Sequence, residues 1–258
     1  MSVLDKRLVS RSFAAAANEY DSNAELQRKV GLQLLNLYSP VAQKGVDLGC
    51  GTGFLTQQLV MNLPGAEWLA LDLAFPMLQV CRERLGMYQN VGYLCADAEA
   101  LPLADASVGQ IYSNLAMQWC ENLPVLFGDC RRVLQTGGQL VFSSFGPKTL
   151  HELKHAWSQV DEYAHVNEFK SADEIVTALS KAGFEDITLE TSVYVSAYLS
   201  VMNLMRELKG LGAHNINSMR KPFPTTPKQL QAMIAAYQAG NEDNLVMATY
   251  EVLMVRAR

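Results

Sequence analysis

The chain has 258 residues and a formal net charge of −5; 49% of its residues are hydrophobic and 18% are charged. This composition supports a full hydrophobic core and excludes an intrinsically disordered chain. The acidic balance argues against nucleic-acid binding over the whole surface, although a local basic patch is compatible with it. The length suits one large domain better than two small ones, so we predict a single domain over residues 1–258.

The cysteines and the N-terminus indicate a cytoplasmic protein. The five cysteines are odd in number and no two have a C-x-x-C spacing, which favours reduced thiols over disulfides or a zinc site. The basic N-terminal residues are not followed by an apolar stretch, so a secretory signal is not expected. The longest weakly polar stretch, 192–205, is too short to cross a bilayer. We therefore expect no bound metal, and neither a membrane nor a nucleic acid as partner.

The first part of the chain, 1–37, is predicted to form a helical lid. Residues 8–37 have a helical pattern, with an alanine-rich run at 14–17. Apolar residues then recur at helical spacing at Leu26, Val30, Leu34 and Leu37. Asp21 and Ser22 are typical helix N-cap residues, so an interruption is expected there.

Residues 40–150 alternate between short apolar runs and helical segments. The expected strands are 45–48, 67–71, 91–95, 109–115 and 138–145. The expected helices between them are 53–62, 75–86 and 122–134. Strands separated by helices need crossover connections, which predicts a parallel α/β sheet. Gly137 and Gly138 are interpreted as the C-cap of the helix that ends at Leu134.

The pattern is less regular after Gly146. Helices are expected at 147–164 and at 171–182, the second beginning with a capping box formed by Ser171 and Glu174. Strands are expected at 186–196 and 245–256. The long segment between them, 197–240, is partly helical, and an insertion of this length in a compact domain is usually functional. We interpret it as a cap over the substrate.

A glycine-rich turn joins the first expected strand to a helix in the sequence VDLGCGTG. Gly49, Gly51 and Gly53 follow a G-x-G-x-G pattern, whereas a dinucleotide fingerprint needs G-x-G-x-x-G. The spacing therefore favours a methyltransferase that uses S-adenosylmethionine over a nicotinamide or flavin enzyme. Asp47 either is an ordinary strand-end residue or caps this loop and accepts a hydrogen bond from the amino group of the cofactor.

Two carboxylates follow the next two strands. Asp72, with Leu73 after it, ends the second strand, where a carboxylate can accept both ribose hydroxyl hydrogens. Asp97 can accept from the adenine amino group while the Ala98 N–H donates to a ring nitrogen. Plain alternatives stay open at this point, because Asp72 also suits a helix N-cap and Asp97 a surface loop.

Four segments resemble the motifs of class I S-adenosylmethionine-dependent methyltransferases: VDLGCGTG, LALDLA, ADAEALPL and GGQLVFSSF. That resemblance implies a seven-stranded, mostly parallel, doubly wound Rossmann-like sheet with an antiparallel last strand. Three more segments, SFAAAANEYDSNAELQR, SNLAMQWCENLP and MRELKGLGAHN, are similar to the malonyl-acyl-carrier-protein O-methyltransferase (BioC) family of biotin synthesis. This resemblance implies S-adenosylmethionine as cofactor, S-adenosylhomocysteine as product, and the carboxylate of malonyl-acyl-carrier protein or malonyl-coenzyme A as methyl acceptor.

A carboxylate acceptor is already ionised near pH 7, so we expect no catalytic acid or base. The candidates for positioning the substrate are Tyr20, Asn114, Gln118, Trp119, Arg206 and Lys209. Asn114 is also a cofactor-binding candidate, and Arg206 would pair with the malonyl carboxylate in a bidentate manner. The family's carrier protein is acidic, and the basic residues that either dock it or form a solvated loop are Lys209, Arg220, Lys221 and Lys228.

Three other functions remain open from the sequence. The first is another small-molecule O- or C-methyltransferase of the same fold, such as a quinone-biosynthesis enzyme. The second is a non-catalytic S-adenosylmethionine-binding assembly factor, and the third is a nicotinamide oxidoreductase. Calorimetry with S-adenosylmethionine and NAD separates the oxidoreductase from the others, and methyl incorporation separates the enzymes from the binding factor.

Overall fold

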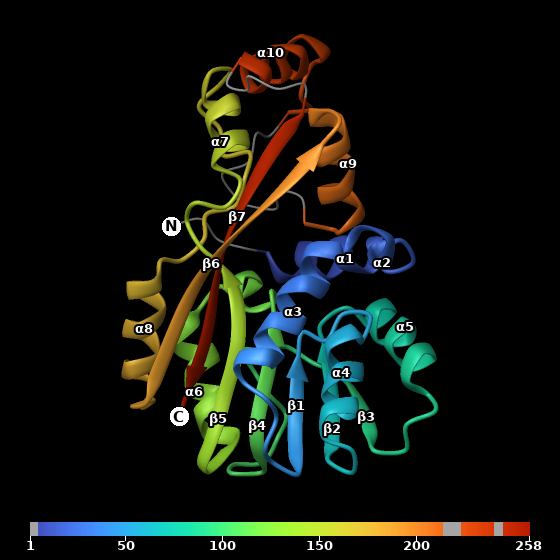
Figure 1. The fold of residues 1–258 in the computed structure, drawn as a ribbon, viewed down its shortest axis with the longest axis vertical. Coiled ribbons are helices and arrows are strands. Elements are labelled where there is room, and N and C mark those ends of the chain that lie inside the picture. Colours follow the sequence, from blue (N-terminus) through green and yellow to red (C-terminus); the bar gives the residue numbers. More distant parts are fainter. Residues whose placement is uncertain (1–4, 214–222, 240–244) are drawn as a thin grey trace.

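The protein is built on a twisted α/β sheet with helices on both faces (Figure 1). The computed structural model describes residues 5–213, 223–239 and 245–258. Within these ranges one sheet has seven strands in the order β3-β2-β1-β4-β5-β7-β6. The strands are β1 (Lys44–Leu48), β2 (Glu67–Asp72), β3 (Val91–Cys95), β4 (Val108–Asn114), β5 (Leu134–Phe145), β6 (Ile187–Tyr198) and β7 (Val246–Ala257).

The strand directions confirm the fold class expected from the sequence. Strands β1 to β5 pair in parallel, and β7 pairs antiparallel with both β5 and β6. The order reverses at β1, because the chain continues from it to β2 and β3 on one side and then returns to β4 on its other side. Ligands of doubly wound sheets bind at such a switch point, beyond the carboxyl ends of the strands.

The helices fall into three groups. The N-terminal group is α1 (Lys6–Ala16), α2 (Tyr20–Asn23) and α3 (Glu25–Leu37). The crossover helices are α4 (Phe54–Asn62), α5 (Phe75–Leu85) and α6 (Leu123–Val133), with a short 3₁₀ helix at Met117–Trp119 before α6. The later helices are α7 (His151–Ser158), α8 (Ala172–Lys181), α9 (Val201–Gly210) and α10 (Pro227–Ala239).

Burial on both faces explains why the central strands are almost continuously apolar. Residues 45–48 of β1 are buried, because one cluster of apolar side chains packs on each side of the sheet. One cluster includes Val30 and Leu59 from α3 and α4, and the other includes Phe127 and Leu179 from α6 and α8. The core therefore fixes the ends of β1, β2 and β4 relative to one another.

The glycine pair after α6 is not a helix C-cap, so that prediction was wrong. The helix α6 ends at Val133, and β5 begins at the next residue and contains both glycines. Here Val108 pairs with Leu134 whereas the next partner of β4, Gln110, pairs with Gln139, so the register shifts. Gly137 has φ 74°, which suits a glycine in a bulge of this kind.

Two helical predictions were partly wrong, one in the N-terminal segment and one in the segment after β5. The expected helix at 147–164 is only α7, which begins after Leu150 in a left-handed conformation with φ 54°. An interruption of the helical pattern is expected at Asp21, but Asp21 lies inside α2. Its carboxylate bonds to Thr52 and Arg84 and does not cap a helix. The capping box of Ser171 and Glu174 at the start of α8 is confirmed.

The segment 197–240 completes β6 and supplies α9 and α10, which lie beyond the end of the parallel strands (Figure 1). Helix α9 meets the N-terminal helices, since a Cβ added at Gly210 would lie 2.5 Å from Asn23 Nδ2. A Cβ at Gly212 would lie 2.8 Å from the carbonyl oxygen of Ser12 in α1. Helix α10 packs against α7. No helix in the described ranges has the length and hydrophobicity needed to span a bilayer.

Candidate active site

The glycine loop after β1 is held by close packing on one side and is open on the other. Gly49, Gly51 and Gly53 have φ values of 73°, 53° and 84°, which an L-residue with a Cβ rarely adopts. A Cβ at Gly49 would lie 2.3 Å from Cβ of Ala116, and one at Gly53 would lie 2.6 Å from Sγ of Cys81. A Cβ at Gly51 would meet no atom within 4 Å. The middle glycine therefore borders open space suited to a ligand.

Asp72 connects the glycine loop to the turn after β2. Its Oδ2 accepts from the Gly51 N–H at 2.9 Å and its Oδ1 accepts from the Ala74 N–H at 2.8 Å. Burial raises the pKa of this carboxyl, while the two backbone donors act in the opposite direction. The carboxylate thus lies where β2 ends, beside the open face of the loop.

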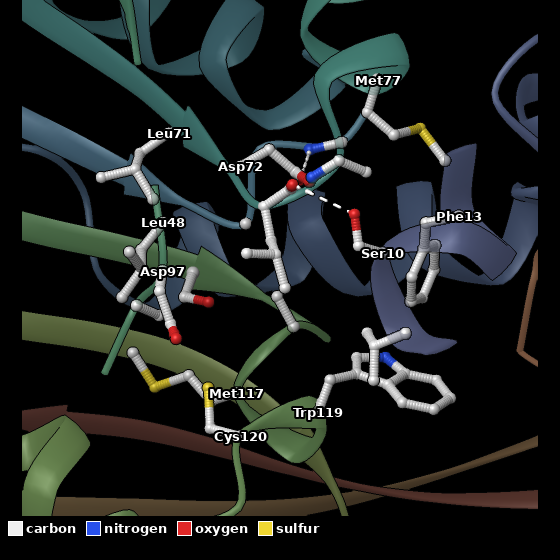
Figure 2. Close-up of a pocket in the computed structure, with 18 of the residues that line it drawn as sticks. Ser10, Phe13, Leu48, Leu71, Asp72, Met77, Asp97, Met117, Trp119 and Cys120 are labelled. Carbon is white, nitrogen blue, oxygen red and sulfur yellow. Dashed lines mark hydrogen bonds between the residues drawn. The ribbon is translucent and has the colours of Figure 1, made fainter. Parts of the chain in front are cut away.

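A cavity of about 810 Å³, its open mouth included, lies at the switch point of the sheet (Figure 2). It is lined by the glycine loop, the ends of β2 and β4, the segment after β3, and α1. Most of the residues predicted from the sequence meet there. They are Tyr20, Gly49, Gly51, Asp72, Leu73, Asp97, Ala98, Asn114 and Trp119.

A second cavity of about 420 Å³ adjoins the first. Tyr20, Gly49, Gly51 and Asn114 line both cavities, so the two lie side by side with these residues at their border. The second cavity is enclosed by the glycine loop and by residues of α2 and α3, and it includes Asp47. Of the predicted positions, Gly53, Gln118, Arg206 and Lys209 line neither cavity.

Asp47 is a fully buried carboxylate with only one oxygen satisfied. Its Oδ2 accepts from the Thr56 hydroxyl at 2.6 Å, and its Oδ1 has no hydrogen-bond partner. Burial raises the pKa of Asp47 to about 7, and the nearby Asp72 adds to the effect. A buried carboxylate with an unsatisfied oxygen on a cavity wall suits a ligand that donates a hydrogen bond or carries a positive charge.

We expect Asp47→Asn to become progressively more stable than the unchanged protein as pH rises from about 4 to about 7. A carboxyl with a raised pKa binds more protons in the folded state, so its ionisation destabilises the fold over the interval between its ordinary value of 3.8 and about 7. The difference between pH 5 and pH 8 should be on the order of 2 kcal/mol. Urea unfolding at both pH values measures it, with exposed Asp105→Asn as control. Parallel pH profiles would contradict the assignment.

Asp97 is paired with a lysine of the N-terminal lid. Its Oδ2 accepts from Lys6 Nζ at 2.5 Å and its Oδ1 accepts from the Glu99 N–H at 2.9 Å. Lys6 also pairs with the buried carboxylate of Glu99. These contacts attach α1 to the segment after β3, so α1 borders this end of the cavity. Local sequence contains no sign of the role of Lys6, because the pair joins residues 91 positions apart.

The turn after β4 presents an aromatic side chain to the cavity. Leu115 has φ 50°, and its carbonyl oxygen accepts from Gln118 Nε2 at 2.7 Å. Gln118 thus stabilises the turn through this hydrogen bond. Trp119 packs edge-on against Phe13 of α1, with ring centroids 5.3 Å apart (Figure 2).

Asn114 is held by both of its amide atoms. Its Nδ2 donates to the Gln27 carbonyl at 2.9 Å, and its Oδ1 accepts from the Ser143 hydroxyl at 2.8 Å. It therefore ties α3 to β4 and β5 at the junction of the two cavities. Sequence reasoning missed three apolar or sulfur-bearing residues that complete this wall, namely Phe13, Met117 and Cys120. Two of them belong to SNLAMQWCENLP, which was the available signal.

The predicted basic residues lie away from the cavity walls. Arg206 and Lys209 are exposed on α9, and Lys228 is exposed on α10 at the far end of the molecule (Figure 1). Arg220 and Lys221 lie outside the described residues. Arg206 is therefore a surface residue of α9.

The fold and the site define a class I methyltransferase. Residues 46–142 match the family described as a methyltransferase domain. A solved structure of phosphoethanolamine N-methyltransferase 2 from Haemonchus contortus, in complex with S-adenosylhomocysteine, superposes with a TM-score of 0.55 at 19% identity. The match covers 88% of this chain and 52% of that one, and at this identity it supports the fold alone.

Relatives of much higher identity define the particular family. The malonyl-(acyl-carrier protein) O-methyltransferase of Methylococcus capsulatus is 43% identical over 96% of this chain and 92% of its own length. The biotin biosynthesis bifunctional protein BioHC of Cellvibrio japonicus is 42% identical over 96% of this chain and 49% of that longer protein. The chain belongs to the malonyl-(acyl-carrier protein) O-methyltransferase family.

Proposed function

We propose that this protein transfers a methyl group from S-adenosylmethionine to the free carboxylate of malonyl-acyl-carrier protein. The ester would begin pimeloyl assembly in biotin synthesis, and the reaction would take place in the cytoplasm. The observation that carries the proposal is the 43% identity, over nearly the whole of both chains, to an enzyme of that name. The two adjacent cavities at the switch point support it independently.

The residues around the cavity suit the cofactor. Asp72 would accept from the ribose hydroxyls, while Asp97 and Ala98 would border the adenine. Gly51 offers space without a side chain, and Asp47 offers an unsatisfied carboxylate oxygen. When bound, S-adenosylmethionine supplies an electrophilic methyl group on a positively charged sulfur.

The acceptor explains why this site needs no general base. A carboxylate is ionised near pH 7, so the protein must orient it and exclude water. Phe13, Met117 and Trp119 provide the apolar wall for that purpose. Burial raises the pKa of Tyr20, with the Asp72 charge adding to the effect, so its phenol stays protonated and can donate to an acceptor oxygen at the junction.

We propose that the carrier protein docks on the exposed basic side of α9 next to the lid. Arg206 and Lys209 are exposed there, α9 packs on α2, and Gly212 just after α9 approaches α1. Lys228, Arg220 and Lys221 belong to the same basic segment and extend the proposed docking set. An acidic carrier protein would be steered to such a surface by charge.

We expect the double charge reversal Arg206→Glu and Lys209→Glu to raise KM for malonyl-acyl-carrier protein about tenfold or more. KM for malonyl-coenzyme A should change far less, because the small thioester does not use the docking surface. Steady-state kinetics at low and high salt measure both values. Lys44→Glu, exposed at the opposite end of β1, is the control. Equal effects on both substrates would contradict docking on α9.

The function itself is tested by transfer of labelled methyl groups to malonyl-acyl-carrier protein, malonyl-coenzyme A, free malonate and a demethylated quinone precursor. We expect base-labile methyl ester on the malonyl thioesters and none on the quinone precursor. Transfer to the quinone precursor alone would replace the proposal with the other methyltransferase activity. Tight cofactor binding without transfer to any acceptor would favour the non-catalytic binding factor.

A further inference from the structure

Leu115, directly after β4, has a backbone conformation that a leucine rarely adopts. Its φ is 50°, in the left-handed region, and the residue lines the larger cavity. Such strain persists only where the surrounding contacts hold it in place, and it concentrates at functional sites. The contacts that hold this turn therefore bear on what the cavity does.

Ser143 of β5 holds the turn through both its backbone and its side chain. The strand register places it opposite Asn114, and it has no exposed surface. The Leu115 N–H donates to the Ser143 carbonyl at 3.1 Å and to the Ser143 hydroxyl oxygen at 3.0 Å. Because this oxygen accepts from a backbone N–H, the hydroxyl hydrogen donates to Asn114 Oδ1, at 2.8 Å. Ser143 thus links the strained turn to the side-chain amide of Asn114.

The contacts of the Asn114 amide also fix the direction in which it faces. Its Oδ1 accepts from Ser143, so its Nδ2 is the atom that donates to the Gln27 carbonyl of α3, at 2.9 Å. Helix α3 packs closely on the same amide, since a Cβ added at Gly31 would lie 3.2 Å from Nδ2 and 3.5 Å from Cγ. Gly31 therefore leaves the room that the amide occupies.

The Asn114 amide keeps one N–H and one oxygen lone pair that these contacts do not use. Asn114 lines both cavities, so this donor lies where a ligand can bind. A carboxylate acceptor loses its negative charge as the methyl group moves from sulfur to oxygen and the neutral sulfide leaves. A cation would therefore stabilise the substrate more than the transition state, whereas a neutral N–H orients the carboxylate with less of this penalty.

We propose that Ser143 and Gly31 are positioning residues that act through Asn114 and direct its second N–H toward the carboxylate of the methyl acceptor. This inference rests on the proposed function and deepens it by naming the groups that orient the acceptor. Neither Ser143 nor Gly31 lines either cavity. Their effect on methyl transfer must therefore pass through the amide that they hold.

Two substitutions disturb the amide from different sides. Ser143→Ala removes the donor to Oδ1, and we expect kcat/KM for malonyl-acyl-carrier protein to fall about tenfold, as the loss of a buried hydrogen bond predicts. Gly31→Ala should also lower kcat/KM, because the added Cβ displaces Nδ2. Alanine favours a helix over glycine, so the unfolding temperature of this variant should be retained or raised. A structural defect alone would lower both values.

The matched control is the neighbouring serine of the same strand. Ser144 is also buried, but its hydroxyl bonds to the Phe145 carbonyl at 3.4 Å. We expect Ser144→Ala to retain kcat/KM. Calorimetry with S-adenosylhomocysteine should give nearly the same affinity for Ser143→Ala, Gly31→Ala and the unchanged protein. A loss of this affinity that matches the loss of kcat/KM would assign the amide to the cofactor and overturn the proposal.

An Asn114→Ala background shows whether the two residues act through the amide. There we expect Ser143→Ala and Gly31→Ala to cause no further loss of kcat/KM. Further losses of the same size would mean that both residues act through general packing and would overturn the proposal. Retention of full kcat/KM by the single variants Ser143→Ala and Gly31→Ala would overturn it as well.

Failure of the proposed function has a different signature in the same assays. Transfer by the unchanged protein to the quinone precursor, and not to the malonyl thioesters, would overturn the proposed function and the carboxylate as the group that Asn114 meets. The same variants measured with that precursor would still support or overturn the positioning role, by the absence or presence of further losses in Asn114→Ala. Transfer to no acceptor would overturn both.

Discussion

Replacement of Asp72 by alanine is expected to raise the dissociation constant for S-adenosylmethionine at least about 100-fold. Hydrogen bonds to a charged group are worth about 1.5–3 kcal/mol each, and the proposed site uses this carboxylate for two ribose hydroxyls. The same carboxylate holds the Gly51 and Ala74 N–H groups, so its loss also releases the glycine loop. Asp72→Ala therefore removes the ribose contacts and the hydrogen bonds that hold the glycine loop at the same time.

A graded series separates these two contributions. Asp72→Asn retains one acceptor oxygen, so we expect an affinity between those of the unchanged protein and Asp72→Ala. Asp186→Ala removes an exposed carboxylate paired with Arg256 near the C-terminus and should leave the affinity unchanged. Calorimetry with S-adenosylmethionine gives each value. A less than tenfold loss in Asp72→Ala would show that the ribose is held elsewhere.

The positions of the proposed cofactor-binding residues could be predicted because each follows from local sequence. Asp47, Asp72 and Asp97 each lie at or just after the end of a strand, and the parallel topology brings those ends to one edge of the sheet. The apolar runs located the strands because both faces of the sheet are buried. The start of β5 is predicted at residue 138, four residues after its actual start at Leu134. The difference arises because the glycine bulge interrupts the apolar pattern there.

Residues of the lid could not be predicted in the same way. Lys6, Phe13 and Arg28 reach the site through packing of helices on distant segments, and the helical pattern does not specify which neighbour a side chain meets. Arg206 was chosen for its chemistry alone, and the fold places it on an exposed helix face. Gln118 lies in the right turn, but its amide bonds inward to a carbonyl rather than lining the cavity.

Within the glycine loop, we expect glycine-to-alanine substitutions at neighbouring positions to differ strongly in their effects on cofactor binding and on stability. Gly51→Ala should abolish measurable cofactor binding while costing only about 1 kcal/mol of stability, the usual penalty of a left-handed L-residue. The added Cβ meets no protein atom within 4 Å, and Gly51 lines both cavities, so the methyl group takes up room at the proposed cofactor site. In the protein without cofactor, Gly51→Ala therefore lowers stability only through the unfavourable backbone conformation of the new residue.

Two other glycines provide the matched controls. Gly137 also has a positive φ, 74° against 53° for Gly51, and a Cβ there would likewise meet no atom within 4 Å. It lies in the bulge of β5 and not at the cavity, so Gly137→Ala should lose similar stability and bind the cofactor normally. Gly49→Ala places a Cβ 2.3 Å from that of Ala116, and we expect it to lose about 3 kcal/mol or more. Urea unfolding and calorimetry on the three variants measure both quantities. Normal cofactor binding by Gly51→Ala would exclude the glycine loop as the cofactor site, because the added methyl group would then meet no part of the cofactor.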